Sequence, residues 1–417
     1  MEYHRFNSSG SSSDSNHHLQ PGNLTSLPSQ RSLVSVPSLN SHSHHFQNRS
    51  TITHNLLTTL TAHTSYVSSL TMAGNFLYTG SSDREIKLWN RTHFHSELFH
   101  PQQYSPTNYN NMVVVAGKGA VKSLVVHSNK LFSAHQDHKI RVWKISNNQN
   151  QEAHQQKHTL LATLPTFSDR VSKVLIPKNH VKIRRHKTCT WVHHVDTVSA
   201  LALSKDGTLL YSVSWDRTIK IWRTKDFTCL ESLSHAHDDA INAIAVSDDG
   251  LIYTGSADTR IKVWSKLQGE KKHTLLDTLE KHNSGINTMA LSNNNCTLLL
   301  YSGACDRSIL VWEKGQDGKM VLVGALRGHN KSILCLAVVA DLICSGSEDK
   351  TIRIWKGFGN KEYSCLAVLE GHRGPIKSLT AVVEEYHCDP SEETSFIIYS
   401  GSLDCDIKVW QIFVPVL

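Results

Sequence analysis

Short runs of alternating apolar and polar residues recur at regular intervals along most of the chain. In seven of them an Asp is followed three residues later by Ile and six residues later by Trp, in the pairs Asp83/Trp89, Asp137/Trp143, Asp216/Trp222, Asp258/Trp264, Asp306/Trp312, Asp349/Trp355 and Asp404/Trp410. A two-residue period of apolar side chains is typical of β-strands, and an Asp just before such a run favours a tight turn. The pattern therefore predicts seven strands, each entered through a turn.

A second pattern precedes each of these strands. A His is followed four residues later by Val or Ile and three residues after that by an apolar residue, beginning at His63, His194, His237, His282, His329 and His372. The second unit keeps Val121 and Leu124 but has Gly117 where the His belongs. One apolar run lies between the two patterns and another lies before each His. Each unit therefore contains four strands, the arrangement of a propeller blade.

The two ends of the repeat region predict how a ring of such blades closes. Only seven residues follow Trp410, too few for a turn and a fourth strand, whereas the segment from His54 to Leu60 matches the outer-strand segment 273–279. We expect this N-terminal strand to complete the last blade. Closure by both ends leaves no open joint between blades and limits the number of exposed strand edges.

Seven such units in register resemble the WD-repeat proteins, and the resemblance covers residues 51–417. It implies an all-β, seven-bladed propeller. It also implies that the His, the Ser two residues before the Asp, the Asp and the Trp form a hydrogen-bonded chain in each blade. Five blades have all four members: His63, Ser81, Asp83, Trp89; His194, Ser214, Asp216, Trp222; His237, Ser256, Asp258, Trp264; His329, Ser347, Asp349, Trp355; and His372, Ser402, Asp404, Trp410.

Two blades depart from this pattern. Blade 5 has Ala304 in place of the Ser, and blade 2 has Gly117 and His135. Ser, His and Asp together can suggest a catalytic triad, but the set recurs five times and catalysis needs one site. We therefore interpret these residues as structural and predict no catalytic residue, no cofactor and no metal site. Pairs of neighbouring His residues have no accompanying Cys or acidic ligands, and no phosphate-binding Gly loop is present.

Partner-binding residues are expected on the top rim, beside the structural residues, where the sequence varies between blades. Trp215 precedes Asp216 at a position where other blades have Ser82, Ala257 or Glu348. It is either a partner-binding anchor or an ordinary aromatic residue at the edge of the channel. The predicted rim residues are Tyr66, Arg84, Trp215, Arg217, Arg307, Glu348, Lys350 and Arg373.

Three segments lie outside the regular repeat. Residues 1–50 are rich in Ser and His and predict a disordered tail, in which the apolar patch 32–39 is either a docking or phosphorylation segment or an inert linker. A basic insertion is predicted at about 144–186, with Lys187–Val192 as the outer strand after it, and an acidic loop at 384–393. Lys182, Arg184, Arg185 and Lys187 form a basic patch that is a nuclear signal, a site for an acidic partner or a solvated strand face.

Charge and composition narrow the class of protein further. The chain has 43 Lys and Arg against 36 Asp and Glu, a net charge of +7, and residues 165–192 alone contribute seven basic residues against one Asp. No apolar stretch is long enough to span a membrane, and no secretory leader is expected. The nine Cys form no C-x-x-C pair, which favours reduced thiols in the cytoplasm or nucleus. Nothing supports sequence-specific binding of nucleic acid.

The insertion together with the segments Ser214–Trp222 and Cys229–Ala240 resembles the plant JINGUBANG-like WD-repeat subfamily. This resemblance implies a non-enzymatic scaffold that regulates growth, transcription or signalling by binding other proteins. We expect a monomeric propeller without a small-molecule substrate. The alternative is a substrate receptor of a cullin-type ubiquitin ligase. These receptors have Asp directly after a repeat Trp, a position occupied here by Asn90, Lys144, Arg223, Ser265, Glu313, Lys356 and Gln411.

Overall fold

The computed structural model describes residues 36–40, 52–91, 112–147, 156–174, 180–184, 187–266, 269–270, 272–294, 297–358, 361–384 and 393–415. The chain divides into two units, Met1–Ser32 and Leu33–Leu417, and all described residues belong to the second. No helix in the described ranges has the length and apolar character needed to cross a membrane.

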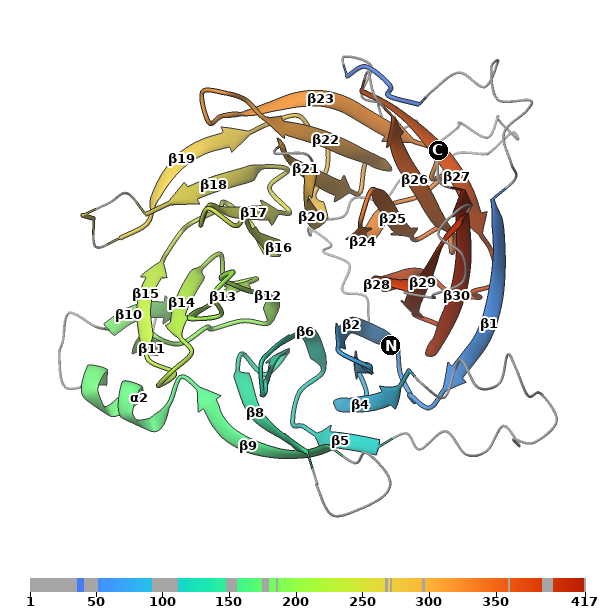
Figure 1. Cartoon of the computed structure of the whole chain (residues 1–417). Coiled ribbons are helices and arrows are strands. Elements are labelled where there is room, and N and C mark those ends of the chain that lie inside the picture. The colour runs from blue at the N-terminus through green and yellow to red at the C-terminus, as the bar shows by residue number, and fades with distance from the viewer. Residues whose placement is uncertain are drawn as a thin grey trace, which may run out of the picture. The chain divides into compact units, whose positions relative to one another are not determined.

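The second unit is a ring of seven four-stranded antiparallel sheets (Figure 1). Each sheet is one blade, and its first strand faces the centre of the ring. Blade 1 contains β2 (Val67–Ala73), β3 (Phe76–Ser81), β4 (Glu85–Asn90) and β5 (Met112–Ala116). Blade 2 contains β6 (Val121–His127), β7 (Lys130–His135), β8 (Ile140–Asn147) and β9 (Gln156–Leu164). Blade 3 contains β12 (Val198–Leu203), β13 (Leu209–Ser214), β14 (Ile219–Arg223) and β15 (Cys229–Leu233).

The remaining four blades repeat this order. Blade 4 contains β16 (Ile241–Val246), β17 (Ile252–Ser256), β18 (Ile261–Ser265) and β19 (Thr274–Leu279). Blade 5 contains β20 (Ile286–Asn294), β21 (Thr297–Ala304), β22 (Ser308–Lys314) and β23 (Met320–Arg327). Blade 6 contains β24 (Ile333–Val339), β25 (Leu342–Ser347), β26 (Ile352–Phe358) and β27 (Glu362–Leu369). Blade 7 contains β28 (Ile376–Glu384), β29 (Glu393–Ser402), β30 (Asp406–Pro415) and β1 (Thr53–Thr61).

The predicted closure of the ring is confirmed. Strand β1 pairs antiparallel with β30, with Leu60 opposite Ile407 and His54 opposite Ile412. The inner strand β2 of blade 1 packs against β28 of blade 7 at the same joint. The seven-bladed, all-β architecture expected from the repeats is therefore present, and the last blade contains strands from both ends of the propeller.

Neighbouring blades are joined by close packing near the centre and by tyrosines farther out. A Cβ atom on Gly303 would lie 2.5 Å from Cγ2 of Ile333, the first residue of the next blade, so only glycine allows this approach. Farther out, the Tyr301 hydroxyl lies 3.2 Å from that of Tyr363 at the start of the next outer strand. The Tyr78 hydroxyl likewise donates to Gln156 Oε1 of blade 2, at 2.7 Å.

The outer strand of blade 2 is Gln156–Leu164, not the predicted Lys187–Val192. Strand β9 and the end of β8 lie within the range predicted as insertion, and the inserted structure follows them. It consists of α2 (Phe167–Val174) and a separate hairpin of β10 (His180–Arg184) and β11 (Lys187–Thr190). The insertion lies at the outer edge of blade 3 (Figure 1), where Asp169 accepts the backbone N–H of Cys229 at 2.9 Å.

Two other predicted boundaries need correction. Glu384, assigned to the acidic loop, is a buried residue of β28 that accepts hydrogen bonds from Ser395 Oγ and Gln411 Nε2. Residues 385–392 lie outside the described part of the chain. In the predicted tail, residues 36–40 contact blades 5 and 6 through parallel β-bridges, Ser38 to Ala325 and Asn40 to Tyr363. The rest of the predicted tail lies outside the described residues.

Candidate functional site

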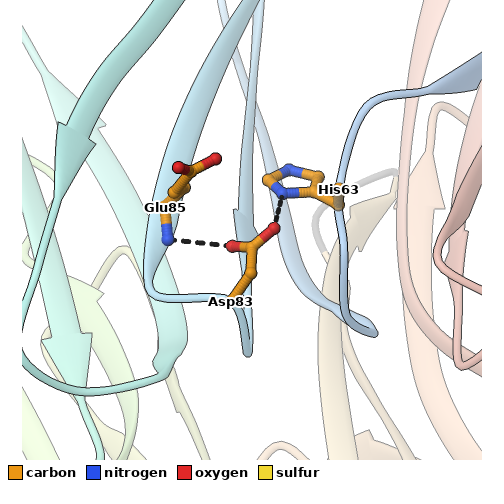
Figure 2. A group of neighbouring side chains, drawn as sticks. All are labelled: His63, Asp83 and Glu85. Carbon is orange, nitrogen blue, oxygen red and sulfur yellow. Dashed lines mark hydrogen bonds and ion pairs between the residues drawn. The ribbon is translucent and has the colours of Figure 1, made fainter.

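The same hydrogen-bonded network links the His, Asp and Trp in six blades. In blade 1, His63 Nδ1 lies 2.7 Å from Asp83 Oδ2, and His63 Nε2 lies 2.8 Å from Thr79 Oγ1. Trp89 Nε1 donates to the same hydroxyl at 3.1 Å. Because the carboxylate can only accept, His63 carries its hydrogen on Nδ1, so the threonine hydroxyl donates to Nε2. Figure 2 shows the His63–Asp83 pair at the turn into β4.

The other five blades repeat this geometry. Their networks consist of His194, Ser212, Asp216, Trp222; His237, Thr254, Asp258, Trp264; His282, Ser302, Asp306, Trp312; His329, Ser345, Asp349, Trp355; and His372, Ser400, Asp404, Trp410. The hydroxyl lies 2.8–2.9 Å from the His and 2.9–3.0 Å from the Trp.

The hydroxyl of the network therefore lies four residues before the Asp, and the prediction of a Ser two residues before it is wrong. Strand register explains the difference, because Trp89 pairs with Leu77 and its indole reaches the side chain two residues farther along β3, that of Thr79. The predicted Ser81 instead accepts the backbone N–H of Asp83 and donates to the carbonyl of Ser65. In the other four blades the predicted serine likewise accepts the Asp N–H, at Ser214, Ser256, Ser347 and Ser402.

Blade 5, in which Ala304 was expected to break the network, has the complete set. Ser302 Oγ lies 2.8 Å from His282 Nε2 and accepts Trp312 Nε1 at 3.0 Å. Ala304 occupies the position that only supports the turn, so its missing hydroxyl leaves the network intact.

In blade 2 a histidine from another position, His135, takes the place of the His that is missing at Gly117. The imidazole of His135 lies beside Gly117, 3.5 Å from where a Cβ atom on that glycine would be. His135 Nε2 lies 2.8 Å from Ser133 Oγ, which also accepts Trp143 Nε1 at 3.0 Å. Asp137, left without a His, forms two hydrogen bonds with Arg141. Both departures from the pattern are thus compensated within the same blade.

The carboxylate of Glu85 lies close to the same Asp and His in blade 1. One ligand atom from each of His63, Asp83 and Glu85 lies within 4.8 Å of the others (Figure 2), a grouping that resembles a metal site. Both ring nitrogens of His63 already bond to Asp83 and Thr79, and Glu85 forms an ion pair with Lys87 at 3.2 Å. These bonds account for the grouping without an ion.

Burial and hydrogen bonding together hold the network in one charge state. Burial lowers the pKa of His63, although the Asp83 carboxylate opposes this effect. Burial alone would raise the pKa of Asp83, but hydrogen bonds from the backbone of Glu85 and from His63, with the His63 charge, lower it overall. In blade 1 these effects favour an ionised Asp83 beside a neutral His63, which is a structural arrangement and not an activated nucleophile.

The residue after the Asp of each blade adopts a left-handed backbone conformation. These turns lie on the face that carries the His and Asp of the networks, called the top face below. Asp83 Oδ1 accepts the N–H of Glu85 two residues on, an Asx turn that stabilises this conformation. The seven φ values lie between 65° and 75°, at Arg84, His138, Arg217, Thr259, Arg307, Lys350 and Cys405. Four of the predicted rim residues therefore occupy the same position in their blades, directly after the Asp: Arg84, Arg217, Arg307 and Lys350.

These four basic residues, and Arg373 beside them, are exposed on the top face. Within the described ranges no ion pair engages the side chains of Arg84, Arg217, Arg307, Lys350 or Arg373. Glu348, by contrast, lies 3.7 Å from Lys331. Among the described residues of the top face, these five basic groups therefore carry charges that no ion pair engages.

Tyr66 and Trp215, which are far apart in the sequence, are brought together by a lysine that the sequence analysis did not single out. Lys122 Nζ donates to the Tyr66 hydroxyl at 3.0 Å and lies 5.7 Å from the centre of the Trp215 ring. Lys122 follows the first residue of β6, so it projects from blade 2 between blades 1 and 3. In the other blades this position has Ser68, Ser199, Asn242, Asn287 and Leu334, and a second lysine, Lys377, occupies it in blade 7.

Charge also accumulates at this part of the channel entrance. Burial raises the pKa of Tyr66, but hydrogen bonds from Ser82 and Lys122 and the charges of Lys122 and Lys377 outweigh it and lower the pKa overall. Burial and the charge of Lys122 both lower the pKa of Lys377. Tyr66, Lys122 and Trp215, called the aromatic–lysine cluster below, therefore combine an exposed indole ring with positive potential.

The predicted basic patch lies on the inserted hairpin. Lys182 and Arg184 belong to β10 and Lys187 to β11, whereas Arg185 lies outside the described residues. Lys182 pairs with Thr188 and Arg184 with Lys187 in the backbone register. The hairpin and the aromatic–lysine cluster are thus separate features, one at the outer edge and one at the channel entrance.

A seven-bladed ring with this repeated network defines a WD-repeat propeller. The family profile described as "WD domain, G-beta repeat" matches residues 54–90, 186–223, 227–265, 273–313, 320–356 and 363–411. These ranges cover more than half of the chain, and the chain belongs to the WD-repeat family. Blade 2, with its substituted network, lies outside the matched ranges.

Several curated proteins are similar to parts of the chain. The small ribosomal subunit protein RACK1 of Drosophila melanogaster is 31% identical over 29% of this chain and 36% of its own length. The ribosome biogenesis protein YTM1 of Scheffersomyces stipitis is 21% identical over 61% and 56%. The protein ROOT INITIATION DEFECTIVE 3 of Arabidopsis thaliana is 29% identical over 36% of each. The chain thus spans between 36% and 56% of the length of these relatives.

Proposed function

We propose that this protein is a non-enzymatic scaffold that binds an acidic segment of a partner protein on its top face. The observation that carries the proposal is the aromatic–lysine cluster, in which Lys122 lies between the rings of Tyr66 and Trp215. Trp215 is 41% exposed, so part of its indole ring is accessible to a partner, and exposed Trp residues are frequent anchors of protein interfaces. A WD-repeat propeller fits such a role because its rigid ring presents many loops on one face.

Charge on the surrounding rim supports an acidic partner. Arg84 and Arg217 are exposed on either side of the cluster, on blades 1 and 3. A carboxylate placed between them gains charge-assisted hydrogen bonds, and an aromatic or aliphatic neighbour stacks on Trp215. We further propose that the protein acts inside the cell, in the control of plant growth, transcription or signalling, as the resemblance to the JINGUBANG-like subfamily implies.

The first test removes Trp215 from the cluster, and Arg217 next to it, without touching the networks. Trp215→Ala combined with Arg217→Ala is expected to reduce capture of partners at least tenfold, because the stacking surface and one cation are both lost. Affinity purification from the expressing tissue, followed by quantitative mass spectrometry, measures this reduction against the wild-type bait. Raising the salt concentration is expected to weaken capture by the wild type as well.

Arg307→Ala combined with Lys350→Ala is the matched control. It removes two cations from the same turn position on blades 5 and 6. The control is expected to retain the partners that the Trp215/Arg217 variant loses. Equal capture by wild type and the Trp215/Arg217 variant would place the site away from these blades. Recovery of a cullin adaptor would favour the ubiquitin-ligase alternative.

A further inference from the structure

A five-residue segment near the N-terminus, Val36–Asn40, lies across the outer strands of blades 5 and 6. It is drawn in blue in Figure 1, beside β23 and β27. Its backbone forms parallel bridges, first to the free edge of β23 at Ala325 and then to β27 at Tyr363. The apolar patch of the sequence therefore docks on the propeller, and the alternative of an inert linker does not describe these five residues.

Six hydrogen bonds hold the segment. Three join backbone groups: the N–H of Leu39 donates to the carbonyl of Ala325, the N–H of Ala325 to the carbonyl of Pro37, and the N–H of Tyr363 to the carbonyl of Leu39, each at 2.9 Å. The other three involve Arg327, whose guanidinium donates to the carbonyl of Val36 and whose backbone N–H and C=O both bond to the Asn40 side chain. The side-chain amide of Asn40 thus forms two hydrogen bonds with the backbone of Arg327, as the backbone of a paired strand residue would.

Two apolar side chains anchor the segment from opposite ends. Val36 is only 4% exposed and packs in the core cluster that contains Tyr253, Met320 and Ala325. Leu39 packs in the next cluster, with Tyr301 and Tyr363. The two anchors lie three residues apart, and Asn directly follows the second. The site therefore fits segments with this pattern.

Gly324 creates the space that Leu39 occupies. A Cβ atom on Gly324 would lie 2.6 Å from Leu39 Cδ2 and 2.9 Å from the carbonyl oxygen of Pro37. Gly324 pairs with Val311, and the register-matched residues of five other outer strands all carry a side chain, at Thr58, Ala162, Glu231, Asp277 and Ala367. The opening is therefore a local feature of blade 5 and not a general property of the repeat.

The joint between blades 3 and 4 shows how such an opening is otherwise filled. There Glu231, the counterpart of Gly324, accepts the backbone N–H of His273 at 2.9 Å and bonds to its ring at 2.7 Å. His273 corresponds to Tyr363, since each lies six residues before the last Leu of its outer strand. Blade 3 thus satisfies this N–H with its own side chain, whereas blade 5 has glycine and leaves the N–H to an added segment.

We propose that the place on blades 5 and 6 occupied by Val36–Asn40, called the slot below, is a second partner-binding site. It recognises an extended protein segment with Val, then Leu three residues later and Asn directly after it. Recognition is by strand addition, because backbone hydrogen bonds supply attraction and the two apolar pockets supply specificity. The chain's own Val36–Asn40 is its intramolecular ligand. A partner segment with this pattern displaces it, and the covalent link gives the resident segment a high effective concentration that sets the threshold for displacement.

The probe is a fluorescent peptide with the sequence of residues 33–43, tested against the full-length protein. Val36→Asp combined with Leu39→Asp empties the slot, because a carboxylate is strongly disfavoured in either pocket. We expect this variant to bind the peptide at least tenfold more tightly than the wild type, whose slot is occupied. A peptide with the same two substitutions is expected not to bind. A second emptied variant, Leu39→Ala with Asn40→Ala, introduces no charge and is expected to bind as well.

Filling the slot provides the matched control. Adding Gly324→Val to the emptied variant is expected to abolish peptide binding, whereas Ala367→Val, at the register-matched position of blade 6, is expected to preserve it. Failure of both emptied variants to bind the peptide, with melting curves like that of the wild type, would overturn the proposal. Equal loss of binding on Gly324→Val and Ala367→Val would do the same. The Trp215/Arg217 variant is expected to leave peptide binding unchanged, so this test and that of the top face are independent.

Discussion

Acidification from pH 7 to pH 4 is expected to lower the free energy of unfolding of the propeller by more than 3 kcal/mol. Burial lowers the pKa of five described His residues from the ordinary value of 6.5, at His63, His135, His158, His193 and His194. For His135 the folded-state value is about 4, which alone corresponds to about 3 kcal/mol.

The sign follows from proton binding. A His whose pKa is lowered in the folded state binds its proton more readily when unfolded. Its stabilising contribution is complete above pH 6.5 and is lost as the pH falls toward the folded-state value. The network Asp residues act at lower pH, because their pKa values are also lowered, to about 2 for Asp258. Their contribution is present above about pH 4 and is lost as the pH falls through the folded-state value. Protonation of the His residues therefore favours unfolding as the pH falls below 6.5, and protonation of the network Asp residues favours it further below about pH 4.

Urea unfolding followed by tryptophan fluorescence at pH 7, 5.5 and 4 measures this loss. His135→Gln, which cannot take up the proton, is expected to show a smaller loss between pH 6.5 and 4 than the wild type. His54→Gln, which changes an exposed residue of β1, is the matched control and is expected to keep the wild-type slope. The same slope in all three proteins would contradict the assignment to His135.

The second large effect is expected in blade 5, where Ser302→Ala should lower the free energy of unfolding by about 2–4 kcal/mol. The substitution leaves two buried groups without a partner, the Trp312 indole N–H and His282 Nε2, and each such group costs about 1–3 kcal/mol. Denaturant unfolding of the purified variant gives the value directly.

Ser81→Ala is the control for this prediction, because it removes a buried hydroxyl from the turn position and not from the network. It is expected to cost about 1 kcal/mol. Blade 5 itself has Ala304 at this position and keeps its network, in line with the smaller cost. Equal losses for the two variants would contradict the assignment of the network hydroxyl to the position four residues before the Asp.

The sequence predicts the blades well because each depends on local spacing that is repeated. The distance from Asp306 to Trp312 fixes a turn and a strand by itself, and seven copies fix the ring. The network hydroxyl depends on register between two strands, which chain spacing does not show. Ser302 and Ala304 lie on the same strand with the same alternation, and only the pairing of Trp312 with Leu300 places the indole near Ser302.

Non-repeated elements were predicted less well for a related reason. The outer strand of blade 2 was located by counting back from His194, and this count fails because the insertion follows Gln156–Leu164. Lys122 contacts Tyr66 and Trp215 only after three blades are assembled around the channel. Val36–Asn40 is too short to show a period, and its binding depends on Gly324, almost 290 residues away in the sequence.

The pairing of β1 with β30 has a consequence for biosynthesis. Residues 53–61 leave the ribosome before every other strand of the propeller, yet their partner, residues 406–415, is the propeller strand that emerges last. Until residues 406–415 emerge, β1 is an unpaired strand that carries Leu56, Leu57 and Leu60, and the loop that its pairing must close is the longest in the domain. The ring therefore cannot close before residues 406–415 have been synthesised, and a nascent chain that stalls before blade 7 is complete presents this strand to chaperones or to other nascent chains.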